Sequence, residues 1–138
     1  MNAADIPTDI DWDLLRSGAR EAMRRAYAPY SGFPVGAAGW DGRTVSTGCN
    51  VENVSYGLGI CAECVLVGNN RVAGGDRLIA VSVCDSRGAI LLPCGRCRQV
   101  LYEFGGKELL IDHRDGPTPL GRLLADAFGP EDLAAGRG

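Results

Sequence analysis

Two short segments of the 138-residue chain carry cysteine pairs with the spacing of metal ligands. The first is Cys61-Ala62-Glu63-Cys64, and the second is Pro93-Cys94-Gly95-Arg96-Cys97. Each follows a loop and leads into an apolar, helix-like run, so both are predicted to place thiols at a helix N-terminus. Unpaired N–H groups and the helix dipole stabilise thiolates there. Thiolates in that position bind zinc well.

A carboxylate, Glu63, stands inside the first of these segments, where the sequence is otherwise apolar. Burying a carboxylate without a partner is costly and raises its pKa, so its presence needs a chemical reason. A metal ion makes water more acidic, and a carboxylate beside that water can accept its proton and return it. The combination therefore favours a zinc centre that carries out proton-transfer chemistry.

The two segments resemble the cytidine deaminase family, in which Cys-Ala-Glu is followed about thirty residues later by Pro-Cys-x-x-Cys-Arg-Gln. Further similar segments occur in the family's order, at residues 30–38, 48–53 and 128–133. The resemblance covers nearly the whole chain. It implies a hydrolase of pyrimidine salvage that deaminates cytidine and 2′-deoxycytidine and holds one Zn²⁺ per subunit.

Three thiolates, from Cys61, Cys94 and Cys97, would fill three positions of a tetrahedral zinc and leave the fourth for water or substrate. The alternative adds Cys64, because two Cys-x-x-Cys pairs also form closed structural zinc sites. The 29 residues between the pairs exceed the usual zinc-ribbon gap of about 15–20, and a structural site has no need of Glu63. On a helix, however, Cys64 lies one turn from Cys61, so its approach to the metal stays open.

The charge of this centre raises a second question. Members of the resembled family often carry an arginine at the position of Cys64, where it can donate hydrogen bonds to the ligand thiolates. Three thiolates on Zn²⁺ leave a net charge of −1, which weakens the acidification of water unless a cation offsets it. Arg96, between the two cysteines of the second segment, is the candidate for this charge compensation.

Asn50 and Glu52 flank Val51, so in an extended chain both side chains point to the same side. An amide and a carboxylate together can bind one hydroxyl group from two directions. The alternative is an Asx-type turn beside a solvated glutamate. The resemblance implies that Asn50 and Glu52 hold the ribose 3′-hydroxyl, which favours a nucleoside over a free base.

The resemblance also assigns the rest of the pocket. It implies that Phe33 lines the pyrimidine site and that the carbonyl of Ala62 orients the amino group. Phe128 resembles an aromatic residue that covers the base from a neighbouring subunit, and Tyr56 one that crosses the interface near the 5′ end of the sugar. One subunit would then not complete a site, so a homotetramer with shared sites is implied.

Composition excludes other partners. The net charge is −3 and no basic run is interleaved with aromatic residues, so the arginines at 16–25 are expected to form a solvated face and no nucleic-acid partner is expected. No stretch of about eighteen apolar residues occurs and the first residues lack a signal pattern, so we expect a cytoplasmic protein without a membrane partner. Six cysteines in a reducing compartment are then ligands or buried thiols.

A rival activity exists in the same fold, because deaminases of blasticidin S-type antibiotics share the Cys-Ala-Glu and Pro-Cys-Gly-x-Cys segments. Residues 50–53 and the tail around Phe128 favour the nucleoside enzyme. A non-catalytic protein stabilised by zinc would instead bind the metal through all four paired cysteines. The sole histidine, His113, is expected in an exposed turn and receives no catalytic role.

The elements that must position these groups follow from periodicity and turn residues. The predicted order is a helix at 11–27, strands at 35–40 and 43–49 around an Asp41-Gly42 turn, a loop at 50–59, a helix at 61–71, a strand at 78–84, a helix at 94–104, a strand at 109–112 and a helix at 120–127. One domain spans 1–138, with a frayed tail at about 134–138. The alternation implies a sheet between helical layers. The resemblance implies a three-layer α/β/α fold with a mixed five-stranded sheet.

Overall fold

A five-stranded mixed sheet forms the centre of the structure, a computed structural model that describes residue 7 and residues 9–137. The strands lie in the order β2-β1-β3-β4-β5. β1 pairs antiparallel with β2 and β3, β3 pairs parallel with β4, and β4 pairs antiparallel with β5. Their bounds are β1 (Gly36–Trp40), β2 (Val45–Cys49), β3 (Ala80–Cys84), β4 (Leu110–Ile111) and β5 (Thr118–Pro119). The mixed five-stranded sheet is therefore confirmed.

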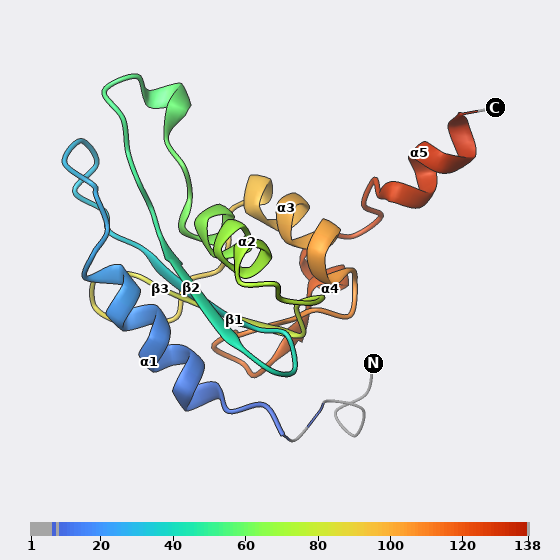
Figure 1. Cartoon of the computed structure of the whole chain (residues 1–138), viewed down its shortest axis with the longest axis horizontal. Coiled ribbons are helices and arrows are strands. Elements are labelled where there is room, and N and C mark those ends of the chain that lie inside the picture. The colour runs from blue at the N-terminus through green and yellow to red at the C-terminus, as the bar shows by residue number, and fades with distance from the viewer. Residues whose placement is uncertain (1–6, 8, 138) are drawn as a thin grey trace.

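Helices cover both faces of this sheet (Figure 1). Helix α1 (Trp12–Met23) packs on β1 and β3 from one side, while α2 (Ala62–Val72) packs on β2 and β1 from the other. Helix α3 (Gly95–Gly105) lies beside α2. All five residues of β3 are buried, as expected for a strand covered on both faces. These contacts confirm the three-layer α/β/α architecture.

Glycine allows both helical layers to approach the sheet closely. A Cβ atom at Gly36 would lie 1.9 Å from the carbonyl oxygen of Ala19 on α1. A Cβ atom at Gly48 would lie 2.4 Å from the carbonyl oxygen of Ala62 and from the backbone nitrogen of Leu66, both on α2. No side chain fits in such a space, so Gly48 sets the distance between β2 and the start of α2.

An ion pair between a buried aspartate and a partly exposed arginine joins α1 to the face of the sheet opposite α2. The Arg16 guanidinium donates to both carboxylate oxygens of Asp112, at 2.8 and 2.9 Å. The Ser82 hydroxyl of β3 donates to the same carboxylate at 2.8 Å, and the Asp112 side chain is fully buried. Because every partner is a hydrogen-bond donor, this burial of charge is compensated, and α1, β3 and the end of β4 are held together.

The hairpin between β1 and β2 differs from its prediction by one residue. The Asp41 N–H donates to the Thr44 carbonyl at 3.3 Å, which leaves Gly42 and Arg43 at the tip in place of Asp41 and Gly42. The Asp41 carboxylate instead accepts hydrogen bonds from the backbone N–H groups of Arg43, Thr44 and Asp76. This capping role requires a short acidic side chain just before the turn.

Both ends of the chain also correct the sequence prediction. Helix α1 ends at Met23 and not near residue 27, because Tyr27 pairs with Val51 in an isolated bridge. The predicted helix at 120–127 is one turn, α4 (Leu120–Leu123), and the tail forms an unpredicted helix, α5 (Pro130–Gly136), which projects from the body in Figure 1. The Gly129 N–H donates to the Asp132 carboxylate at 2.7 Å and caps α5. Residue 138 of the predicted frayed tail lies outside the described residues.

Two long loops connect the helices to the strands at one end of the sheet (Figure 1). The stretch between β2 and α2 contains one turn of 3₁₀-helix, η2 (Tyr56–Leu58), and the stretch between α1 and β1 contains residues 24–35.

The helices in the described part of the chain do not combine the length and apolar character needed to cross a membrane.

The close approach at Gly48 makes a testable prediction. We expect Gly48→Ala to lower the free energy of unfolding by about 1–3 kcal/mol or more, because the new methyl group overlaps the backbone of α2. Gly68→Ala on α2 is the matched control, since a Cβ atom there meets open space, and it should raise stability by about 0.5–1 kcal/mol. Urea unfolding measures both, and equal stability of the two variants would contradict the prediction.

Candidate active site

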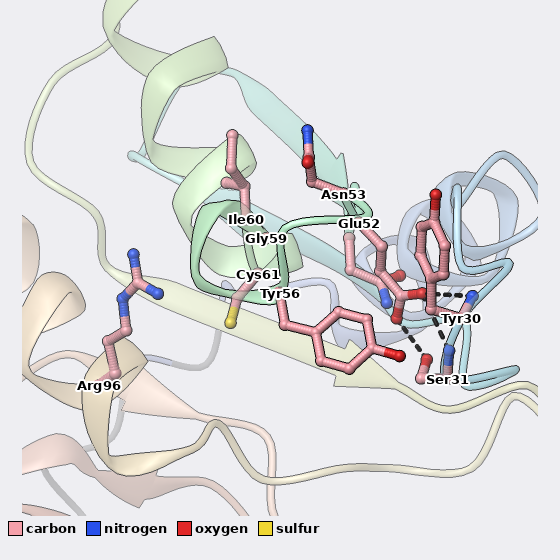
Figure 2. Close-up of a pocket in the computed structure, with 10 residues that line it drawn as sticks. Tyr30, Ser31, Glu52, Asn53, Tyr56, Gly59, Ile60, Cys61 and Arg96 are labelled. Carbon is pink, nitrogen blue, oxygen red and sulfur yellow. Dashed lines mark hydrogen bonds between the residues drawn. The ribbon is translucent and has the colours of Figure 1, made fainter.

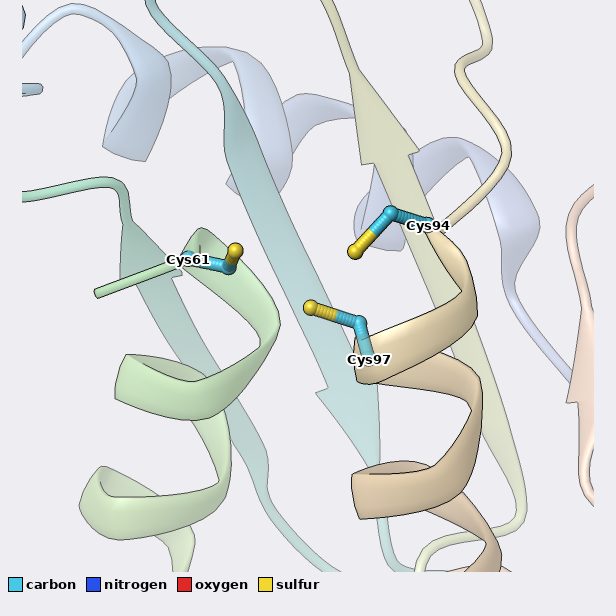
Figure 3. Close-up of side chains that lie close together, drawn as sticks. All are labelled: Cys61, Cys94 and Cys97. Atoms are coloured by element: carbon cyan, nitrogen blue, oxygen red, sulfur yellow. The ribbon is translucent and has the colours of Figure 1, made fainter. Parts of the chain in front are cut away.

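Three cysteine thiols converge where α2 and α3 begin (Figure 3). Cys61 is the N-cap residue of α2, Cys94 is the N-cap residue of α3, and Cys97 lies in the first turn of α3. Their sulfur atoms all lie within 4.8 Å of one another. Three thiolates on a tetrahedral zinc, with Zn–S bonds of about 2.3 Å, have sulfurs about 3.8 Å apart. The donor set and its spacing therefore fit a zinc ion.

Cys64 does not belong to this group. Within the part of the chain that the structure describes, the three sulfurs of Cys61, Cys94 and Cys97 form the cluster with metal-ligand spacing, and Cys64 lies outside it. Cys64 is half-buried one turn further along α2. The closed four-cysteine arrangement, which the spacing alone allowed, is therefore not formed, and a fourth position remains for another ligand.

The thiols differ in how readily they ionise. Burial raises the pKa of the Cys61 thiol, and burial together with the charge of Glu63 raises the pKa of Cys97. Burial also acts on Cys94, but the backbone N–H groups of Cys97 and Arg96 at the start of α3 outweigh it and lower the pKa of that thiol. A divalent cation would favour the thiolate form of all three.

Glu63 lies in the same cavity as these thiols. Its residue is only 4 % exposed, and burial raises the pKa of its carboxyl group. A cavity of about 420 Å³ joins it to the cluster; its lining is Ser31, Phe33, Val35, Asn50, Cys61, Ala62, Glu63, Leu91, Leu92, Cys94 and Cys97. The structure thus brings a buried acid and three potential metal ligands together with Phe33, Asn50 and Ala62.

A second cavity of about 400 Å³ adjoins the first and shares Ser31, Asn50 and Cys61 with it. Figure 2 shows this cavity, with Glu52 and Tyr30 on one side of the view and Arg96 on the other. Its other lining residues are Asn53, Tyr56, Gly59 and Ile60. A ligand with a ring and a polar extension could therefore occupy both cavities.

Asn50 and Glu52 both hold the segment that leads into β1. The Asn50 amide donates to the Phe33 carbonyl and accepts from the Val35 N–H, each at 2.9 Å. The Glu52 carboxylate accepts from the N–H groups of Tyr30 and Ser31, at 3.0 and 3.1 Å, and from the Ser31 hydroxyl. These contacts exclude an Asx-type turn at Asn50, because its amide bonds to Phe33 and Val35 while the Glu52 N–H donates to the Tyr27 carbonyl. The Glu52 carboxylate is hydrogen-bonded to residues 30 and 31 at the surface of the loop.

The two side chains retain matching capacity for one further group. Asn50 keeps one N–H donor, and the Glu52 carboxylate, with about four acceptor sites, has three in use. A hydroxyl group both accepts and donates, so it would satisfy both. The Ser31 hydroxyl and the N–H groups of Ser31 and Tyr30 also lower the pKa of Glu52, so its carboxylate form is favoured.

The remaining predicted residues lie at the edge of the site or away from it. Tyr56 is 79 % exposed, and its ring centroid lies 5.9 Å from that of Tyr30. Arg96 is exposed beside Cys61, and among the described residues its guanidinium forms no hydrogen bond with a thiol. Phe128 is 64 % exposed and lines a separate hollow with Gln99 and α5, so one chain does not bring it to the thiols.

Sequence reasoning missed the residues that support the site. Arg98 donates to the carbonyl of Pro93, just before Cys94, and to the carbonyl of Leu123 at the end of α4, both at 2.8 Å. Ser31 joins Glu52 to the Phe33 segment. Both lie inside segments that carry the family resemblance, but their spacing does not reveal which backbone groups they contact.

Comparison with models of protein families identifies a match over most of the chain. Residues 13–112 match the model of the "Cytidine and deoxycytidylate deaminase zinc-binding region". This range contains Cys61, Glu63, Cys94 and Cys97.

Individual proteins agree with the family match. The chain is similar to the cytidine deaminase of Mycobacterium tuberculosis strain H37Rv, with 59 % identity over 127 residues, covering 91 % of this chain and 95 % of that one. It is 39 % identical to the cytidine deaminase of Sporosarcina psychrophila over 135 residues, covering 91 % and 96 %. The crystal structure of cytidine deaminase from Mycobacterium tuberculosis superposes with a TM-score of 0.86 at 57 % identity, covering 88 % of this chain and 99 % of that one. That from Mycobacterium leprae gives 0.83 at 49 %, covering 86 % and 100 %.

The sulfur geometry predicts how zinc binding responds to substitution. Cys97→Ser should bind zinc far more weakly, because a serine hydroxyl is not deprotonated as a thiol is and Cys97 is one of the three clustered ligands. Cys64→Ser should retain the metal, since that sulfur lies outside the cluster. Metal analysis after gel filtration measures both, and loss of zinc from the Cys64 variant would restore the four-cysteine interpretation.

Proposed function

The chain belongs to the cytidine deaminase family, and on this premise we propose that it hydrolyses cytidine and 2′-deoxycytidine to uridine and 2′-deoxyuridine with release of ammonia, a reaction of pyrimidine salvage. The observation that carries the proposal is the shared cavity of Glu63 and three clustered thiols. One Zn²⁺ per subunit would be held by Cys61, Cys94 and Cys97. When bound, it would make water acidic enough to act as a nucleophile near neutral pH.

Glu63 performs the proton transfers. Its burial beside the thiols favours a carboxyl group that can both accept and give up a proton, because burial raises its pKa towards neutrality. It takes a proton from the attacking water and delivers one to N3 of the pyrimidine, which makes C4 more electrophilic. After the hydroxide adds to C4, Glu63 takes the proton of the new C4 hydroxyl and passes it to the amino group. The C4–N bond then breaks, ammonia leaves, and the oxygen on C4 becomes the carbonyl of uridine.

The neighbouring residues orient the nucleoside. The spare donor of Asn50 and the spare acceptor site of Glu52 suit the ribose 3′-hydroxyl, which can accept one hydrogen bond and donate another. Phe33 lines the cavity beside the thiols and packs against the pyrimidine, and the carbonyl of Ala62 orients the amino group. A ribose hydroxyl held in this way favours nucleosides over free cytosine.

A homotetramer with shared sites completes the proposal. Large apolar side chains are exposed on the loop before α2 and on the tail; they are Val54, Tyr56, Leu58, Ile60, Phe128 and Leu133. Burying them against further copies of the chain would remove apolar area from water. Phe128 then covers the base bound by a neighbouring copy, and Tyr56 contributes across the interface near the 5′ end of the sugar.

Two further assignments belong to this proposal. Arg96 offsets the charge of the thiolates through space, since it lines the second cavity beside Cys61. Arg96→Ala should lower turnover or zinc affinity, and unchanged values of both would contradict the assignment.

The enzyme acts in the cytoplasm, where the reducing environment keeps thiols available as ligands, and all six cysteines are unpaired.

The role of Glu63 is tested by Glu63→Gln. The rate of cytidine deamination, measured as ammonia release, should fall by about 10²–10⁴-fold. The amide keeps the shape of the carboxyl group but transfers no proton. Bound zinc should stay unchanged. Glu21→Gln, an exposed substitution on α1, is the matched control. If the unmodified protein is as inactive towards cytidine as the variant, cytidine is not its substrate, and blasticidin S becomes the substrate to test.

The sharing of sites is tested by complementation. Phe128→Ala should lower kcat/KM for cytidine about 10-fold or more, because a buried phenyl group contributes about 1.5–3 kcal/mol. Tetramers assembled randomly from Phe128→Ala and Glu63→Gln chains should then recover about a quarter of the wild-type sites, each combining an intact Glu63 with a neighbour's Phe128. Co-expression with two affinity tags isolates the mixed tetramers, and mixed tetramers without recovered activity would show that the sites are not shared.

A further inference from the structure

Ser31 is hydrogen-bonded to both halves of the proposed substrate site. Its hydroxyl donates to Oε2 of Glu52 and accepts from the Phe33 N–H at 3.0 Å. Its own N–H donates to Oε1 of Glu52 at 3.1 Å. Ser31 also lines both cavities, and Figure 2 shows it beneath the Glu52 carboxylate. No other side chain in the described part of the chain donates a hydrogen bond to this carboxylate.

We propose that Ser31 is a positioning residue that fixes the orientation of the Glu52 carboxylate and thereby sets the preference of the enzyme for nucleosides with a 3′-hydroxyl group. The inference rests on the proposed role of Glu52 in binding that hydroxyl. Ser31 itself does not touch the reacting atoms.

The distribution of hydrogen bonds on Glu52 supports this role. Oε1 receives two backbone N–H groups, from Tyr30 and Ser31, whereas Oε2 receives the Ser31 hydroxyl alone. Oε2 is therefore the oxygen with a free acceptor site for substrate. The last torsion of a glutamate side chain has a broad, shallow energy profile, so the position of Oε2 depends on its partner. Removing the Ser31 hydroxyl leaves the substrate-facing oxygen without a protein partner.

The same hydroxyl links the ribose site to the base site. By accepting from the Phe33 N–H two residues along, it closes a small turn over Gly32, which has φ +65. Phe33, which lines the cavity beside the thiols, is held independently by Asn50, whose amide donates to the Phe33 carbonyl at 2.9 Å. Loss of the Ser31 hydroxyl would therefore release the Glu52 carboxylate while Asn50 keeps the Phe33 backbone in place.

The test compares cytidine with 3′-deoxycytidine, which lacks only the hydroxyl in question. For Ser31→Ala we expect KM for cytidine to rise about 10-fold, while kcat stays within about two-fold of the wild-type value. The reason is that the hydrogen bond between the 3′-hydroxyl and the Glu52 carboxylate is weakened equally in the ground state and in the transition state. For 3′-deoxycytidine, kcat/KM should stay within about two-fold of the wild-type value. A general loss of structure would instead lower kcat/KM for both substrates.

Three further variants give the comparison its controls. Ser31→Thr keeps the hydroxyl at an exposed position and should retain the wild-type preference. Ser17→Ala makes the same chemical change at an exposed position on α1 and should leave both substrates unaffected. The double variant Ser31→Ala with Glu52→Gln should be no worse with cytidine than Glu52→Gln alone, because Ser31 acts through Glu52. Zinc content and the thermal midpoint of each variant confirm that it is folded.

The failure of this inference and the failure of the proposed function give different results. If Glu52→Gln lowers kcat/KM for cytidine but not for 3′-deoxycytidine while Ser31→Ala affects both equally or neither, the inference is wrong and the role of Glu52 stands. If wild-type enzyme treats the two nucleosides alike, the proposed binding of the 3′-hydroxyl by Glu52 is wrong, and the inference falls with it. If Glu52→Gln and Ser31→Ala each lower kcat/KM for cytidine but not for 3′-deoxycytidine, the role of Glu52 and the role of Ser31 are both supported.

Discussion

The meeting of two helix N-termini on one face of the sheet is the constraint on which the site depends. Three thiols and a carboxyl group lie close together where α2 and α3 begin, and in the absence of a cation their negative forms repel one another. Burial raises the pKa of Cys61, Cys97 and Glu63, while the N–H groups at the start of α3 lower that of Cys94. A divalent ion is the ligand that relieves this concentration of acidic groups. The same burial suits Glu63 to the proposed proton transfer, so the proposed metal binding and acid–base chemistry would arise from one arrangement.

The sheet maintains this arrangement through contacts distant from the thiols. On one face, Gly48 allows α2 to rest against β2 with backbone contacts only, which fixes the start of the helix that carries Cys61 and Glu63. On the other face, the ion pair of Arg16 with the buried Asp112 holds α1 to β3. Breaking such a pair leaves an uncompensated buried charge, so the sheet keeps its helices in register on both sides. The geometry of the three clustered thiols therefore depends on packing contacts that do not involve the thiols themselves.

Local sequence signals predicted the elements well, whereas groups distant in sequence were harder to place. The cysteines before α2 and α3 and the glycines after them mark helix ends, and Gly106 has the positive φ typical of a helix terminus. The hairpin tip differs from the prediction by one residue because the Asp41 carboxylate accepts from the N–H groups of Arg43 and Thr44 and so stands before the turn. The bond from the Asp76 N–H to the same carboxylate, 35 residues away, has no local signal in the sequence. Whether Cys64 joins the cluster also depends on where α3 approaches α2. Spacing within one helix cannot decide this, and neither α5 nor the contacts of Ser31 with Glu52 have a periodic signature.

The hydrogen bonds of Asn50 and Glu52 explain how the proposed nucleoside site can be built on a loop. Loops pay an entropic cost when a ligand orders them, and that cost reduces affinity. Here both side chains already bind the backbone of residues 30–35, so the segment that carries Phe33 is ordered before any substrate arrives. Each side chain uses part of its capacity for the fold and keeps one donor or acceptor for a hydroxyl group. The two residues proposed to bind the sugar therefore also order the segment that carries Phe33, through contacts that involve the backbone of that segment.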